Sequence, residues 1–348
     1  MKRFTHVPIL DRCAYQVYGG LSNVYRWIAS SRLLTVTKAK IDVMVNPISN
    51  RIDIFCNQRR VQASSLIVTI FGDAVLPRGG QVWLGSLIYL LAPMQLNERL
   101  VRTSVFRLVK DGWLSAETVG RRANYALTPW GRRRFEEASS QIYAARAPVW
   151  DQRWRMILVV GELTTKQREQ LRRTLFWKGF GLIGSNCFIH PGARLDEAID
   201  ALSAEGLQSL LPRLMPMTAE DFQSAHAASD ADLVTHAWDL SALSQSYAEF
   251  VALYSPIRDY VLENSVTNDE QAFLLRMLLI HDYRRLLLRD PELPDSLLPK
   301  DWSGRQARAV CKVLYKQIEA ASERYLDKTL QLADGTALAR QAGTKRFV

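Results

Sequence analysis

Hydrophobic residues recur every three to four positions between residues 64 and 111, and this spacing predicts three consecutive helices. The first covers Ser64–Leu76 and is broken by the Pro77-Arg78-Gly79-Gly80 stretch that follows it. The second covers Val82–Leu91 and is closed by Pro93, and the third covers Asn97–Asp111. This part of the chain is therefore expected to be a compact helical unit.

The third helix has clear ends and two different sides. Asn97 is a suitable N-cap, and Gly112 stands just after the helix, where a left-handed residue is favoured. At about 100° per residue, Val101, Val105 and Leu108 form one stripe. We expect this stripe to face the core, which turns the basic side of the helix outward.

The pattern then changes to two short alternating segments. Trp113–Val119 and Ala123–Thr128 are typical of paired strands joined by a turn at Gly120-Arg121-Arg122. Thr128-Pro129 then opens a basic helix that runs to about Arg146. Three helices and a two-stranded wing describe a winged helix-turn-helix, whose third helix enters the major groove of DNA.

Strands and helices alternate in the middle of the chain. The predicted elements are a strand at Trp154–Gly161, a helix from the Thr164-Thr165-Lys166-Gln167 capping box to Lys178, a strand at Gly179–Ile189, a helix at Leu195–Glu205 and a strand at Ser209–Met215. This order predicts a small sheet with helices on one face.

The two ends of the chain are less regular. From about Ala225 onward the pattern is helical, and the polar tail after Asp327 is expected to be loose. Met1–Arg60 has no sustained period, although Val43–Phe55 alternates loosely in a way that favours strands. We expect removal of Met1–Arg60 to leave a folded, DNA-binding protein.

Charge is distributed unevenly along a chain whose formal net charge is +10. Arg99–Arg134 holds nine Lys and Arg residues against two acids, whereas Leu195–Pro299 holds eighteen acids against six arginines. Such asymmetry indicates that the basic part meets a polyanion. We expect DNA contacts from the outer face of the third helix and from the wing tip. The candidates are Arg99, Arg102, Thr103, Phe106, Arg107, Lys110, Arg121 and Arg122.

The sequence shows few signs of a metal site, a cofactor site or a membrane segment. The four cysteines form no CxxC pair and the five histidines show no metal-ligand spacing, so we expect no metal, no cofactor and a cytoplasmic protein. No stretch is apolar enough for a membrane span or a signal peptide. Gly179-Phe180-Gly181-Leu182-Ile183-Gly184 spells GxGxxG, but it follows a helix and opens a strand, the reverse of a dinucleotide site.

Several longer blocks resemble the PaaX family of repressors of phenylacetic acid degradation. They are Ser65-Leu66-Ile67, Gly72-Asp73, Arg78–Leu87, Glu98–Thr103, Gly120-Arg121-Arg122, Trp150-Asp151, Ile280–Arg285, Asp290–Pro294, Leu297-Leu298-Pro299 and Trp302-Ser303-Gly304. The third helix also resembles that of the broader GntR-type regulators. The resemblance covers about Ala63 to Gln317, so Met1–Arg60 looks like an addition.

The resemblance implies an α+β protein with three parts: a winged helix, a ferredoxin-like middle domain and a helical C-terminal domain. It also implies a homodimeric repressor of an aromatic catabolic operon that phenylacetyl-coenzyme A releases from double-stranded operator DNA. The predicted divisions are an extension at 1–61, the winged helix at 62–146, the middle domain at 147–222, an effector and dimerisation domain at 223–326, and the tail at 327–348.

The segment after Ile280 is the candidate effector site. His281, Arg285 and Arg289 are four residues apart, and arginine forks suit the phosphates of a coenzyme A thioester. Aromatic rings suit adenine or phenyl. The full candidate set is His281, Tyr283, Arg284, Arg285, Arg289 and Trp302. The alternative, that the arginines pair with nearby acids such as Asp282, stays open.

Two other functions remain as alternatives to a DNA-binding repressor. One is a non-catalytic protein-interaction module that uses the winged helix. The other is a metal-dependent nuclease, because the middle domain resembles small ferredoxin-like CRISPR nucleases at the level of fold. Such a nuclease needs a carboxylate at the end of the first strand, where Glu162 stands alone. We therefore expect no enzymatic activity.

Overall fold

The computed structural model describes residues 46–58, 62–220, 228–341 and 346–347. These residues divide into two compact units. Of the described residues, unit 1 contains 46–58, 62–140, 256–281 and 314–341, and unit 2 contains 141–220, 228–255, 282–313 and 346–347. The three long helices α12 (Ser241–Glu263), α13 (Asp269–Leu287) and α14 (Ser303–Thr329) each begin in one unit and end in the other.

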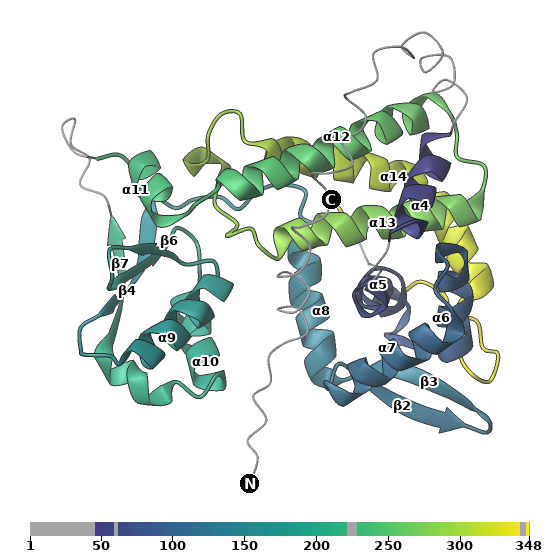
Figure 1. The fold of residues 1–348 in the computed structure, drawn as a ribbon, viewed down its shortest axis with the longest axis horizontal. Coiled ribbons are helices and arrows are strands. Elements are labelled where there is room, and N and C mark those ends of the chain that lie inside the picture. The colour runs from purple at the N-terminus through teal and green to yellow at the C-terminus, as the bar shows by residue number, and fades with distance from the viewer. Residues whose placement is uncertain (1–45, 59–61, 221–227, 342–345, 348) are drawn as a thin grey trace. The chain divides into compact units, whose positions relative to one another are not determined.

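Unit 1 begins with the helices and strands that the first sequence pattern predicts (Figure 1). Its elements are α4 (Pro47–Cys56), α5 (Ala63–Ile70), the π-helical turn η1 (Phe71–Val75), the 3-10 turn η2 (Leu76–Arg78), β1 (Gln81–Trp83), α6 (Leu84–Leu91), the 3-10 turn η3 (Ala92–Met94), α7 (Glu98–Lys110), β2 (Leu114–Val119), β3 (Arg122–Leu127) and α8 (Pro129–Ile142).

A three-stranded antiparallel sheet with the order β1-β3-β2 follows the helices of unit 1. The hairpin β2–β3 pairs from Leu114 with Leu127 to Val119 with Arg122, and β1 adds to its other edge. The predicted helix at Val82–Leu91 is thus wrong at its start, because Val82 and Trp83 pair with β3 before α6 begins. Val82 pairs with Tyr125 and Trp83 with Asn124, which lie 43 and 41 positions later, and local periodicity does not register such distant partners.

The segment before residue 60 corrects a second expectation. Residues 47–56 form helix α4 and not strands, and α4 buries Ile48, Ile52 and Phe55 on one side. These positions are four and three apart, which is the spacing of one helix face. Residues 46–58 are therefore part of the core of unit 1, and this burial argues against the expectation that Met1–Arg60 can be removed, which stays a prediction. The rest of that expectation concerns residues 1–45 and 59–60, which lie outside the described ones.

The C-terminal tail is a third correction. It was expected to be loose after Asp327, but α14 continues to Thr329 and the next residues pack on unit 1. Leu330 and Ala333 are buried, and the Ala333 amide donates to Oδ1 of Asn124 in β3 at 2.7 Å. Residues 330–341 are therefore fixed by contacts that lie about 200 residues away in the sequence.

Unit 2 contains a four-stranded antiparallel sheet with the order β5-β6-β4-β7. Its elements are β4 (Arg153–Val159), α9 (Thr165–Trp177), β5 (Gly181–Ile183), β6 (Cys187–His190), α10 (Leu195–Ala204), the 3-10 turn η4 (Gln208–Arg213), β7 (Leu214–Glu220), α11 (Asp230–Ala237) and the 3-10 turn η5 (Asp295–Leu297). This β-α-β-β-α-β topology agrees with the ferredoxin-like arrangement predicted for the middle domain.

Two details of this sheet differ from the prediction. Gly179–Ile189 forms two strands, because the chain turns at Gly184, whose φ is 58°. The last strand starts at Leu214, since Pro212 ends a 3-10 turn where a strand was expected. The capping box of α9 is confirmed, with Thr164 and Gln167 bonded reciprocally.

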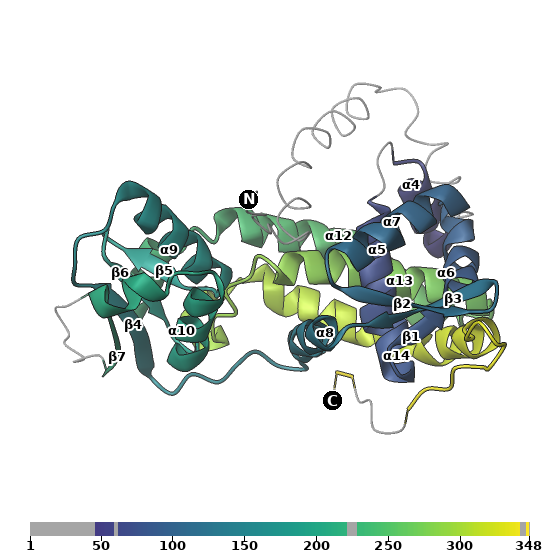
Figure 2. The same cartoon turned by 90° about the horizontal axis from the view of Figure 1, so that it is seen from below.

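Both faces of this sheet are covered. Helices α9 and α10 pack on one face (Figure 2), where Ile157, Leu171 and Leu202 belong to one buried cluster. On the other face, Trp154 and Ile189 pack with Val234 of α11 and with residues 293–298. The helices and antiparallel sheets of the two units make an α+β protein, as the sequence predicts.

Candidate nucleic-acid interface

Helix α7 is held in place by its apolar side and by both of its caps. Val101, Val105 and Leu108 are at most 1% exposed, which confirms the predicted stripe. Oδ1 of Asn97 accepts the amide of Leu100 at 2.9 Å, as expected of an N-cap. Gly112 follows the helix with a φ of 76°, a conformation that favours glycine. The buried stripe and the two helix ends therefore determine which side chains of α7 point outward.

The outward face of α7 gathers six of the eight predicted DNA-binding side chains. All six are exposed: Arg99, Arg102, Thr103, Phe106, Arg107 and Lys110. Arg102 pairs with Glu98 one turn earlier, but both side chains are more than half exposed. Arg99, Arg107 and Lys110 make no ion pair with any part of the chain that the structure describes. Phe106 is 68% exposed, an unusual position for an aromatic ring.

The two arginines of the wing behave differently from each other. Arg121 is exposed and has no ion pair among the described residues. Arg122 is exposed too, but its Nη1 donates to the carbonyl of Ala333 at 3.1 Å and its guanidinium lies 4.7 Å from the ring centre of Trp83. Arg122 therefore also ties the wing to the C-terminal segment.

A hollow of about 350 Å³ joins the helix and the wing. It is lined by Arg102 of α7, by Arg121 and Arg122 of the wing, and by residues 83–85 at the start of α6. Cationic side chains beside backbone amides at a helix start are typical of phosphate contacts. The face thus combines side chains that suit base edges with side chains that suit the phosphate backbone.

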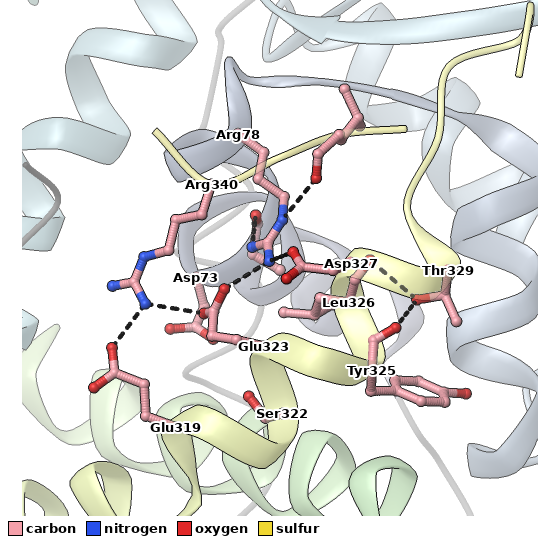
Figure 3. Close-up of polar contacts among 12 residues, drawn as sticks. Asp73, Arg78, Glu319, Ser322, Glu323, Tyr325, Leu326, Asp327, Thr329 and Arg340 are labelled. Carbon is pink, nitrogen blue, oxygen red and sulfur yellow. Dashed lines mark hydrogen bonds and ion pairs between the residues drawn. The ribbon is translucent and has the colours of Figure 1, made fainter. Parts of the chain in front are cut away.

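Unit 1 also contains a network of charges, and Figure 3 shows the part of it around Arg78, Glu323 and Asp327. Nε of Arg276 in α13 donates to Asp73 Oδ2 at 2.6 Å, and its Nη1 donates to Glu323 Oε1 at 2.6 Å. Arg78 bonds Glu323 and Asp327 of α14 at 2.6 and 2.7 Å. The network joins the end of the first predicted helix to α14, so the C-terminal helix is built into unit 1.

The network sets the protonation of its carboxylates. Burial favours a higher pKa for Glu323, but the charges and hydrogen bonds of Arg276, together with Arg78 and Arg340, outweigh it and lower the pKa below its ordinary value. Arg276 is fully buried and yet stays charged, because Asp73 and Glu323 compensate it. Asp73 and Arg78 belong to the blocks that resemble the PaaX family, but nothing in the sequence assigned them to a charge network. The available signal was Arg276 itself, a cation inside the apolar run Leu274–Ile280.

The predicted effector residues lie in different surroundings. His281 is buried in unit 1, where its Nδ1 lies 3.1 Å from Oγ1 of Thr69. In unit 2, Tyr283 and Trp302 are buried against Phe250 and Tyr247, and burial raises the pKa of the Tyr283 hydroxyl.

The three arginines of that set differ in exposure. Arg284 is buried, Arg285 is half-buried and Arg289 is exposed. Arg289 also lies beyond the end of α13 at Leu287, so it does not share a helix face with His281 and Arg285. Their predicted role in effector binding stays a prediction.

The structure gives little support to a nuclease site, a membrane span or a dinucleotide site in the part of the chain that it describes. Glu162 is exposed in the loop after β4, and the described residues hold no group of three or more His, Cys, Asp or Glu side chains suited to a metal. The described helices include none that is both long enough and apolar enough to cross a membrane. The GxGxxG stretch starts after α9 and leads into β5, as expected of a helix stop.

This chain is similar in sequence to proteins of one family. Family models match three stretches: "PaaX-like protein" at residues 62–131, "PaaX protein central Cas2-like domain" at 147–230, and "PaaX-like protein C-terminal domain" at 238–328. The curated protein "Transcriptional repressor PaaX" of Escherichia coli (strain K12) is 34% identical over 269 residues, which cover 77% of this chain and 84% of that protein. A solved structure, "Uncharacterized protein Rv0674 from Mycobacterium tuberculosis", is 24% identical with a TM-score of 0.49, over 74% of this chain and 98% of that one.

Proposed function

The chain belongs to the PaaX family, and we propose that it is a non-enzymatic transcriptional repressor that reads operator DNA with α7 and the β2–β3 wing of a winged helix-turn-helix. Its relative in Escherichia coli is named as a transcriptional repressor. In this proposal the winged helix comprises residues 62–146, and its contacts come from the exposed face of α7 and from Arg121 and Arg122.

One observation carries the proposal: the outward face of α7 is cationic, and three of its cations form no ion pair with the residues that the structure describes. Charges that stabilise a fold are normally paired, as those around Arg276 are. Arg99, Arg107 and Lys110 are rigidly presented and remain available for phosphates or guanine edges. Phe106 beside them suits the methyl group of thymine.

We also propose which genes the repressor controls and which effector releases it. The repressor controls a phenylacetic acid catabolic operon, and a coenzyme A thioester such as phenylacetyl-coenzyme A releases it from DNA. Release requires that the effector bind the DNA-incompetent form better than the competent one. The protein acts as a homodimer on a pseudo-palindromic operator, with half-sites about one helical turn apart or a multiple of it. A measured mass that corresponds to one protein chain bound to one full operator would rule out the dimer.

The direct test uses duplexes selected from a random library by the wild-type protein. Arg107→Ala should weaken binding to the selected duplex by roughly 10-fold, because a base contact contributes about 1–3 kcal/mol. The matched control is Arg173→Ala on α9, an exposed helical arginine outside the proposed face. Equal losses for both variants, or no selected duplex at all, would remove DNA reading from α7 and favour a protein-interaction role.

A further inference from the structure

Unit 2 contains a large cavity that the proposed DNA contacts do not use. Its volume is about 1270 Å³, and it lies between the linker at residues 145–153 and the first turns of α14. Pockets for small molecules usually measure about 300–1,000 Å³, so this one has room for a coenzyme-sized ligand. Five cations line it: Arg146 and Arg153 near the linker, and Arg305, Arg308 and Lys312 on α14.

Three of the four acids that line the cavity lie beside arginines. Asp151 forms two hydrogen bonds with Arg155, and Glu220 pairs with Arg153 at 2.7 Å. Asp295 lies 3.4 Å from Arg305 and 3.7 Å from Arg308. Asp230 accepts the indole N–H of Trp154 at 2.9 Å. The lining thus carries five cations against four acids. Asp230 keeps its charge, because an indole N–H is neutral, and Oδ1 of Asp295 makes no hydrogen bond with the described residues.

Two cations are left over. Arg146 and Lys312 form no ion pair with the residues that the structure describes, and they come from the linker and from α14. Lys312 shares its helix side with Arg305 and Arg308, at spacings of three and four residues. Trp150 lines the same cavity and contributes an aromatic ring. Cations and an aromatic ring that line one cavity suit a phosphorylated ligand that carries a ring system.

We propose that this cavity of unit 2 binds the phosphorylated effector, with Arg146 and Lys312 holding its phosphates. The inference rests on the proposed function, which supplies a coenzyme A thioester as the ligand. It places the ligand at the linker and α14. None of the six residues that the sequence singled out lines the cavity, although Tyr283 interacts with Arg308 of the lining.

The test measures binding of phenylacetyl-coenzyme A to the full-length protein by calorimetry, without DNA. Arg146→Ala with Lys312→Ala should weaken binding at least 10-fold, and Lys312→Arg should retain most of the affinity. Lys316→Ala, an exposed lysine one turn further along α14, is the matched control and should bind like wild type. Free coenzyme A should compete for the site and phenylacetate should not, because only the former carries phosphates.

The outcomes separate the cavity from the rest of the proposed function. Wild-type affinity in the double variant, or competition by phenylacetate alone, would overturn the cavity while leaving the effector in place. If the wild-type protein binds no thioester but still binds its selected duplex, both the effector and the cavity assignment fail and the DNA-binding role stands. A loss of duplex affinity in the double variant without any effector would make the cavity part of the DNA surface and would overturn the proposal.

Discussion

Two sets of arginines in unit 1 illustrate how burial changes the role of one residue type. Arg276 and Arg78 are almost completely enclosed, and each reaches two carboxylates within 2.7 Å. Arg99 and Arg107 lie on α7 in solvent without an ion pair among the described residues. Buried charges must be compensated inside the protein, whereas exposed ones are free to meet an external polyanion. The first set should therefore govern stability and the second should govern binding.

The largest effect is expected from breaking the buried set. Arg276→Ala leaves Asp73 uncompensated in the core and should lower the free energy of unfolding by about 3–5 kcal/mol. Urea unfolding followed by circular dichroism measures this loss. The control is Arg107→Ala, which should change stability by less than about 0.5 kcal/mol. Similar values for the two variants would abolish the distinction between the sets.

A second comparison of buried and exposed positions is offered by α4. Phe55 is 4% exposed, so Phe55→Ala should cost roughly 3 kcal/mol through lost burial and a cavity. The neighbouring Ile54 is 49% exposed, and Ile54→Ala should be nearly neutral. Thermal unfolding of both variants measures the difference. A neutral Phe55→Ala would mean that α4 is not part of the core of unit 1.

The buried network should also make unit 1 sensitive to acid. The pKa of Glu323 is lower in the folded protein than its ordinary value of 4.5. Its contribution is therefore complete above about that pH and is lost as the pH falls through the lowered folded value. Urea midpoints between pH 7 and pH 3 should fall less steeply for Glu323→Gln than for wild type. Parallel curves would show that Arg276 does not control this carboxylate.

The smallest expected effect concerns the cap of the exposed helix. Asn97→Ala removes the acceptor for the Leu100 amide and should cost about 1 kcal/mol. It should also weaken DNA binding slightly, because the outward side chains of α7 depend on the helix for their position. The control is Asn97→Ser, which keeps a capping oxygen. An uncapped variant with unchanged stability would show that packing alone fixes α7.

The sequence predicted best what short-range signals determine. The stripe of Val101, Val105 and Leu108, the Asn97 cap and the glycine stop all lie within 16 residues, and the structure agrees with each. It failed where partners are distant. Strand β1 needs β3, and the tail needs Asn124 of the same strand.

The buried network was beyond sequence reasoning for the same physical reason. Asp73 and Arg276 are separated by 203 positions, and no local pattern records that they meet. The cavity of unit 2 likewise joins the linker to α14, about 150 residues apart. The exposed faces of helices can be predicted from periodicity, whereas buried charge clusters and cavities depend on the tertiary fold.

The central claim, that the outward face of α7 lies against DNA, is tested most directly by photo-crosslinking. A photoreactive benzoyl-phenylalanine replaces Phe106, which is 68% exposed on that face, or Phe176 on α9 as a control, which is 40% exposed. After irradiation with the selected duplex, the protein labelled at 106 should become attached to bases in both half-sites, and the protein labelled at 176 should not. Crosslinking from 176 but not from 106, with duplex affinity intact in both, would contradict the account.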